Sequence, residues 1–176
     1  MGLIRKILDI IRNRPPSTQP PVQSPSTPID TNSLQQSLLD AHNQERDANG
    51  LPKLRLNLQL FLAAQQHAQW MSDAKTMSHT GANGSDPGAR ISAEGYHAQA
   101  WGENIAEGYQ SVAAVMDGWM LSRGHRHNIL SLNYIEVGFG MVNYYWCADF
   151  GAPTGNALPG AVGQSLSGPL KYSDTN

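Results

Sequence analysis

A run of prolines near the start of the chain separates an N-terminal segment from the folded domain that follows. Residues 15–28 contain six prolines among serine, threonine, glutamine and valine, and they include no charged side chain. Proline fixes φ and lacks an amide donor, so such a segment stays extended and contributes to no core. We therefore expect a linker over residues 15–32, with an isolated element over 1–14 before it.

Residues 1–14 have the pattern of a short amphipathic, basic helix. Aliphatic side chains gather on one arc of the helical wheel, charged side chains lie on the opposite arc, and the net charge is about +3. This pattern is typical of an anchor on a membrane surface or in a groove of a partner protein, and packing against the chain's own domain is the alternative. The apolar arc consists of Leu3, Ile4, Ile7, Leu8, Ile10 and Ile11.

The length and composition of the chain limit it to one core. It has 176 residues, 40% of them apolar, and a formal net charge of −2 with acidic and basic residues interspersed, which argues against nucleic acid as a partner. The single cysteine, Cys147, excludes an intramolecular disulfide and a cysteine-based zinc framework. No stretch is long and apolar enough for a transmembrane helix, and Arg5, Lys6 and Asp9 interrupt what would be the apolar core of a signal peptide.

Helical periodicity and cap signals predict an α+β domain over residues 33–151. Ser33 and Gln36 form a candidate capping box, and Asn57 and Asp86 are candidate N-caps. The helices are expected over 33–49, 57–76, 86–94 and 111–121.

The rest of the domain is predicted to be short strands and turns. Gly124 is expected to end the last helix and to place His125 in a turn, and Asn143 is the expected turn of an antiparallel hairpin. Residues 152–176 are rich in glycine and proline without periodicity, so a C-terminal tail is expected there. The strands are expected over 101–106, 135–142 and 144–150.

Three polar blocks combine a histidine or a carboxylate with glycine among apolar neighbours. Such polar groups are usually held at the wall of a pocket, so His79, Glu103 and His125 become candidates for one shared site. Imidazole and carboxylate together can bind a divalent metal, move protons or hold a polar ligand. His67 falls on the apolar side of its helix and is interpreted as a packed core histidine outside that site. The blocks are Ser78-His79-Thr80-Gly81, Trp101-Gly102-Glu103-Asn104-Ile105-Ala106 and residues 119–130.

Seven sequence blocks, in order from about Leu34 to Gly151, resemble the CAP superfamily of cysteine-rich secretory, antigen 5 and pathogenesis-related proteins. The resemblance is closest to its disulfide-free bacterial branch, and it covers about two thirds of the chain. The blocks are His42-Asn43-x-x-Arg46, Gly50-Leu51-Pro52-x-Leu54, Ser78-His79-Thr80-Gly81, Gly102-Glu103-Asn104-Ile105-Ala106, Trp119-x-x-Ser122-x-Gly124-His125-Arg126-x-Asn128-Ile129-Leu130, Val137-Gly138-Phe139-Gly140 and Tyr145-Trp146-x-x-Asp149-Phe150-Gly151.

The resemblance implies an α-β-α sandwich of three to four helices on a small antiparallel sheet, with a cleft lined by a His/Glu tetrad. Carried over by position, the tetrad residues are His79, Glu103 and His125, while Ser122 stands where the eukaryotic members have a second glutamate. Two imidazoles and one carboxylate would leave a divalent metal such as zinc with an open coordination position.

Four further polar residues are interpreted as structural. Asn43 and Arg46 are expected to tie the first helix of the domain to the sheet by hydrogen bonds. Asn104 and Asn128 are expected to satisfy backbone groups near the cleft.

The sequence favours a non-catalytic binding module that takes a lipid, an envelope component or a divalent metal in the cleft lined by His79, Glu103, Ser122 and His125. A metal-assisted, peptidase-like hydrolase is the first alternative, with any catalytic role falling on the same four residues. A structural or decorating subunit of a larger assembly, docked by residues 1–14, is the second. By resemblance, the protein is expected to be bacterial and secreted, either extracytoplasmic or at the cell surface.

Overall fold

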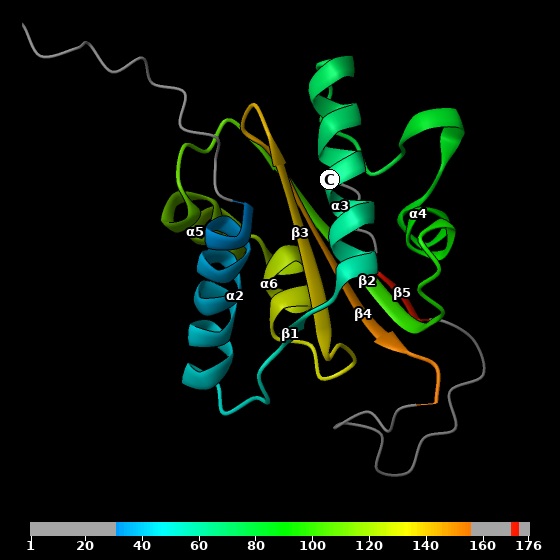
Figure 1. Cartoon of the computed structure of the whole chain (residues 1–176). Helices are drawn as coiled ribbons and strands as arrows, with labels where there is room; N and C mark the ends of the chain where they lie inside the picture. Colours follow the sequence, from blue (N-terminus) through cyan, green and yellow to red (C-terminus); the bar gives the residue numbers. More distant parts are fainter. Residues whose placement is uncertain (1–30, 156–169, 173–176) are drawn as a thin grey trace, which may run out of the picture.

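The computed structural model describes residues 31–155 and the backbone of residues 170–172 (Figure 1). The predicted helix over 1–14, nearly all of the linker and most of the tail lie outside the described residues. In chain order the elements are α2 (Thr31–Ala48), β1 (Arg55–Leu56), α3 (Leu58–Ala74), the 3-10 turn η1 (Ala82–Gly84), α4 (Pro87–Ala93), β2 (Ala98–Glu107), α5 (Val112–Leu121), α6 (Arg123–Ile129), β3 (Glu136–Val142), β4 (Tyr145–Pro153) and β5 (Leu170–Tyr172).

The described strands form one mixed sheet with helices on both faces. The strand order is β1-β3-β4-β2-β5, in which β4 is antiparallel to β3 and β2, whereas the edge strands β1 and β5 run parallel to their neighbours. Helices α2, α5 and α6 lie over one face of the sheet, and α3 and α4 lie over the other (Figure 1). This arrangement confirms the predicted α+β sandwich.

Alternation along the long strands sends one set of side chains to each helical layer. On β4, Trp146, Ala148 and Phe150 join the main core beneath α2, α5 and α6. Cys147 and Asp149 therefore face α3 and α4. The main core also contains Leu38, Val115, Trp119, Ile129, Val137 and Phe139.

Two glycines of β3 let the backbone of α3 lie directly on the sheet. A Cβ at Gly138 would overlap the backbone of Phe61, and one at Gly140 would overlap the backbone of Ala64. Any side chain at either position would push the helix away from the strand.

The outer edge of β3 is covered by glutamine side chains where β1 has ended. Gln35 of α2 donates from Nε2 to the Phe139 carbonyl at 2.7 Å and accepts from the Phe139 amide at 3.2 Å. Gln65 of α3 accepts from the Met141 amide at 3.2 Å. The two helices thus occupy backbone groups that a further strand would otherwise pair.

Two predicted N-caps are confirmed and the predicted capping box is wrong. Asn57 caps α3 by accepting from the amides of Gln59 and Leu60, and the Asp86 side chain caps α4 by accepting from Ala89. The capping box at Ser33 does not form because α2 already begins at Thr31. Ser33 lies inside that helix, where its carbonyl accepts from the Ser37 hydroxyl.

The chain between α5 and α6 also differs from the prediction. Gly124 does not end a helix and His125 does not lie in a turn. Helix α5 stops at Leu121 because Ser122 is extended, with ψ of 128°, and the chain then enters α6, which contains both Gly124 and His125. A single extended residue between two helices leaves no glycine or proline signal in the sequence.

The sequence did not predict strands β1 and β5, and it predicted a shorter hairpin turn than the structure has. The hairpin turns through both Asn143 and Tyr144, whose φ values of 48° and 65° suit a two-residue turn, so Asn143 alone is not the turn. Strand β5, within the expected tail, pairs with Ala100, Trp101 and Gly102 of β2. Strand β1 forms where only a connection was expected.

Arg46 and Asn43 hold α2 to the rest of the domain by hydrogen bonds, as expected, although their partners lie in connections and at the end of α6 and not in the sheet. The guanidinium of Arg46, 1% exposed, donates to the carbonyls of Pro52, Ile129 and Ser131 at 2.7 to 2.8 Å. Asn43 pairs with both the amide and the carbonyl of Leu54, just before β1. One helix turn therefore fixes the entry to the sheet and the exit from α6.

Replacing Arg46 with methionine should lower the free energy of unfolding by at least about 3 kcal/mol, because three buried carbonyls lose their donors. Arg55→Met is the matched control: the Arg55 side chain is 65% exposed and pairs with Glu136 at the sheet edge, so a loss below about 1 kcal/mol is expected. Urea unfolding at neutral pH measures both, and equal losses would contradict the role given to Arg46.

Candidate functional site

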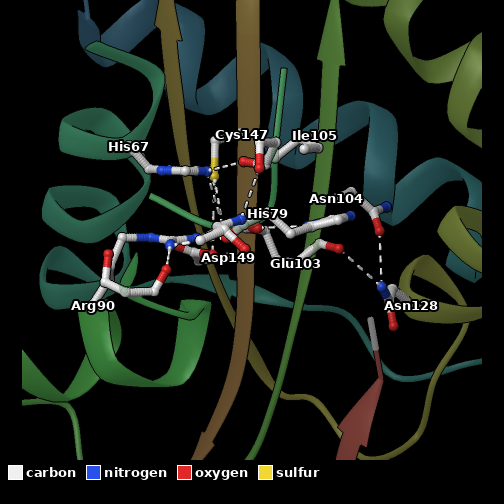
Figure 2. Close-up of polar contacts among 12 residues, drawn as sticks. His67, His79, Arg90, Glu103, Asn104, Ile105, Asn128, Cys147 and Asp149 are labelled. Carbon is white, nitrogen blue, oxygen red and sulfur yellow. Dashed lines mark hydrogen bonds and ion pairs between the residues drawn. The ribbon is translucent and has the colours of Figure 1, made fainter. Parts of the chain in front are cut away.

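Glu103 lies at the centre of a buried polar cluster on β2 (Figure 2). Alternation along the strand turns its side chain toward α3 and α4, and it turns the side chain of Asn104 toward α6. Glu103 is only 2% exposed. A carboxylate removed from water to this extent needs charged or hydrogen-bonding partners.

Three basic side chains surround the Glu103 carboxylate (Figure 2). His79 Nδ1 lies 2.7 Å from Oε1, Arg90 Nη2 lies 2.5 Å from Oε2, and His67 Nε2 lies 3.9 Å from Oε2. Burial alone opposes ionisation of Glu103, but the His79 hydrogen bond and the Arg90 charge outweigh it, so the pKa of this carboxyl lies below its usual value. Glu103 is therefore ionised at neutral pH.

The contact with Glu103 fixes the orientation of the His79 imidazole. Because an ionised carboxylate can only accept, Nδ1 carries a proton and donates it to Glu103. The His79 side chain is 23% exposed, so the opposite ring nitrogen, Nε2, is the atom left for a ligand. In the neutral ring, Nε2 offers a lone pair to a metal or a hydrogen-bond donor.

Arg90 and His67 hold the loop that carries His79. Arg90 Nη1 donates to the carbonyls of His79 and Ser85 at 3.0 and 2.9 Å, and His67 Nε2 lies 2.8 Å from the Ser78 carbonyl. The loop is therefore attached to both α4 and α3 through the same side chains that face Glu103.

His67 belongs to this cluster, so its predicted place outside the site is corrected. It is a packed histidine as expected, since it is 1% exposed and its ring stacks on Trp70 at 5.6 Å. Burial lowers the pKa of His67, although the nearby Glu103 charge opposes that shift. The apolar periodicity of its helix could not reveal that the same face meets a carboxylate on β2.

A second carboxyl lies behind Glu103. Cys147 Sγ is 3.5 Å from Glu103 Oε2 and 3.9 Å from Asp149 Oδ1. Burial, together with the Glu103 charge, raises the pKa of Asp149 well above its usual value, so Asp149 holds a proton. Burial also raises the pKa of the Cys147 thiol, which agrees with the interpretation of Cys147 as a buried, inert thiol.

The residues near Glu103 fit a metal only in part. The ligand atoms of Glu103, Cys147 and Asp149 lie within 4.8 Å of one another. However, Cys147 and Asp149 keep their protons, and the Glu103 charge is already matched by Arg90. Both Glu103 oxygens are engaged, so Glu103 suits the orientation of a metal-binding His79 better than direct ligation.

Ser122 and His125 approach β2 from the other helical layer. The His125 main-chain oxygen accepts from Asn104 Nδ2 at 3.0 Å, and Asn128 Nδ2 donates to the Glu103 carbonyl and to Asn104 Oδ1. Ser122 is the N-cap residue of α6, and its side chain makes no capping hydrogen bond. The structure thus brings His79 and Glu103 together, confirms the backbone-binding roles of Asn104 and Asn128, and leaves a site shared with His125 as a prediction.

Two hollows of the described surface are lined by other residues. One, of about 450 Å³, lies between α4 and the start of β2. The other, of about 420 Å³, lies where α2, β1 and α3 begin. Their linings are Asp86, Gly88, Ala89, Ser92, Tyr96, His97, Ala98 and Trp101 for the first, and Asn32, Gln35, Gln36, Leu56, Asn57, Leu58 and Phe61 for the second.

The fold, the His79 loop and the Glu103 strand together correspond to a known family. Residues 39–150 match the model of the CAP family, described as the cysteine-rich secretory protein family. This chain belongs to that family, which confirms the resemblance found in the sequence blocks.

Relatives in Bacillus subtilis (strain 168) extend beyond the length of this chain. The uncharacterized protein YkwD is 31% identical over 117 residues, which are 66% of this chain and 46% of that protein. The uncharacterized membrane protein YlbC is 31% identical over 122 residues, which are 69% of this chain and 35% of that protein. The chain thus spans less than half the length of either relative.

Solved structures share the fold. An extracellular protein containing an SCP domain from Bacillus anthracis str. Ames superposes with a TM-score of 0.68 at 29% identity, covering 73% of this chain and 44% of that chain. An outer surface protein from Borrelia burgdorferi superposes with a TM-score of 0.64 at 20% identity, covering 72% of this chain and 97% of that chain. At that identity the second likeness concerns the fold alone.

Asp149→Asn should make stability less dependent on pH. In the folded state Asp149 keeps its proton to higher pH than in the unfolded chain, so its contribution to stability falls as pH rises above the usual aspartate pKa. Asparagine carries no such proton, so the stability of the variant relative to the wild type should rise as pH increases above the usual aspartate pKa, by at most about 1.4 kcal/mol per pH unit. Urea unfolding at several pH values measures the difference in the free energy of unfolding between the variant and the wild type.

Asp117→Asn is the control for that series, because Asp117 is exposed on α5. Its stability should follow the wild-type pH profile. A constant difference between Asp149→Asn and the wild type across the range would show that Asp149 is ionised in the folded protein.

Proposed function

We propose that this protein is a non-catalytic binding module of the cell envelope that takes a polar or metal-containing ligand at His79. The observation that carries the proposal is the buried, ionised Glu103, which holds the His79 ring by Nδ1 while the side chain of His79 stays 23% exposed. Burying a charged group is costly, so a buried carboxylate whose hydrogen bond orients one partly exposed imidazole points to a use for that imidazole.

Metal-assisted hydrolysis at the same imidazole is the second candidate. The carboxylate-imidazole pair is the arrangement that orients a general base or a metal ligand. The binding role ranks first because Ser122, the one hydroxyl predicted for this site, starts a helix on the other side of the sheet from the Glu103 carboxylate.

The site for this binding is proposed to be outside the cytoplasm, with residues 1–14 as the anchor. Support comes from the names of relatives, which include an extracellular protein from Bacillus anthracis and the secreted protein RBT4 of Candida albicans. None of the helices among the described residues has the length and apolar character to cross a bilayer. The apolar arc and basic charge of residues 1–14 suit a helix lying in the membrane surface or docking a partner assembly.

His79→Ala should weaken zinc binding at least tenfold, because Nε2 is the proposed ligand atom. Glu103→Gln should weaken it by about 10- to 100-fold, since the ring loses its orienting carboxylate. His97→Ala, at an exposed histidine before β2, is the matched control and should bind zinc like the wild type. Zinc titration followed by imidazole nitrogen NMR measures all three, and unchanged affinity in His79→Ala would remove zinc from the proposal.

Removal of residues 1–14 should abolish flotation of the protein with phosphatidylcholine/phosphatidylglycerol vesicles. In the full chain, Ile7→Asn together with Ile11→Asn leaves the charge unchanged and should lower vesicle affinity by at least tenfold, since each change removes about 2 kcal/mol of apolar transfer. Val22→Asn in the linker is the control and should float like the wild type. Equal flotation of the truncated and full chains would rule out the anchor.

A further inference from the structure

The hollow at the start of α2, β1 and α3 is an apolar groove with several aliphatic side chains in water. Leu58 is 69% exposed, Leu56 is 39% exposed and the neighbouring Leu62 is 36% exposed. Leu56, Leu58 and Phe61 line the groove on one side, opposite the first turns of α2. Exposed aliphatic side chains gathered at one concave place are typical of an interaction site.

The chain enters its described part at the rim of this groove. Helix α2 begins at Thr31, and the next residue, Asn32, already lines the hollow. The 16 residues 15–30 that precede it, when extended at about 3.1 Å per residue, reach roughly 50 Å. A tether of this length keeps the groove within reach of residues 3–13 of the same chain.

The N-terminal segment matches what such a groove binds. A helix laid in an apolar groove uses anchors at i, i+3 or i+4, and i+7, which here are Ile4, Ile7 and Ile11. A volume of about 420 Å³ is within the range that accommodates several such side chains. The groove also has an acidic group beside it for the basic face of the segment, because Asp40, one turn further along α2, accepts from Gln36 on the groove wall.

We propose that residues 3–13 occupy this groove when no membrane is present, with Ile4, Ile7 and Ile11 against Leu58 and Phe61. The inference rests on the proposed function, because the same apolar arc is the one that enters the bilayer. Groove and membrane then compete for one surface of one helix. Membrane binding empties the groove. In the free protein, only the molecules whose segment is out of the groove can bind a membrane, so the apparent membrane affinity falls in proportion to that fraction.

A spin label tests the contact directly in the full chain. Asn13→Cys places a reactive thiol on the polar arc, while Cys147 is 1% exposed and stays unlabelled. The label should broaden amide resonances of residues 56–62 more than those of α5. Leu58→Glu should remove this difference, because a carboxylate replaces the main apolar contact; glutamate in the first turn of α3 suits the helix dipole, so the fold is kept.

Leu121→Glu is the matched control, since Leu121 is 85% exposed at the end of α5 and carries the same change of charge. It should keep the broadening of residues 56–62. In vesicle partition with phosphatidylcholine/phosphatidylglycerol, Leu58→Glu should bind at least about threefold more tightly than Leu121→Glu, because its segment is already free.

The outcomes separate the two proposals. Absence of selective broadening at residues 56–62, or equal partition of the two glutamate variants, would overturn groove docking, whereas the anchor itself is decided by flotation of the truncated chain. A sample that mixes spin-labelled and isotope-labelled molecules should show no broadening. Broadening in that mixture would assign the groove to the segment of a second copy and would overturn docking within one chain.

Discussion

A single ionised carboxylate inside the protein organises this domain. Glu103 is almost fully buried on β2, and the side chains that compensate its charge come from the His79 loop, from α4 and from α3. Arg90 and His67 also bind carbonyls of that loop, so one charge aligns three segments. The close packing explains Gly81, whose Cβ would lie about as close as 3.0 Å to Arg90 Nη1 and 3.1 Å to His67 Nδ1.

The sheet divides the polar blocks into two layers. Glu103 and Asn104 are neighbours in sequence but face opposite sides of β2, so the His79 loop contacts the first and α6 contacts the second. Asn128 joins the layers, because its amide reaches the carbonyl of Glu103 from the α6 side. His79 is therefore connected to α6 through one strand, and a shift of that strand would be felt on both faces.

Local signals in the sequence predicted local structure well. The caps at Asn57 and Asp86 follow from one side chain and the amides two or three residues away, so a single sequence suffices to find them. The pairing of His79 with Glu103 was expected from the polar blocks that contain them and from the resemblance, not from their spacing. The second helix, α6, which starts just after the extended Ser122, had no signal in the sequence.

The other members of the cluster had no such signal. Arg90 lies on a short helix and Asp149 on a core strand. Both lie near Glu103 only because β4 pairs with β2 in the sheet and α4 packs against β2. Asp149 looked like one more residue of a β-rich run. The pKa of Asp149 is raised by its burial and by the charge of Glu103 beside it, and both are consequences of tertiary packing.

The glutamine contacts along β3 have a consequence for a protein proposed to gather at a surface. A bare strand edge is a template for another chain, and two-dimensional confinement raises the chance that neighbouring copies meet edge to edge. Gln35 satisfies both backbone groups of Phe139, and Gln65 satisfies the next amide that points outward, so the edge offers an arriving chain few partners. Crowding of many copies on a bilayer can then proceed without fibrillar growth through β3.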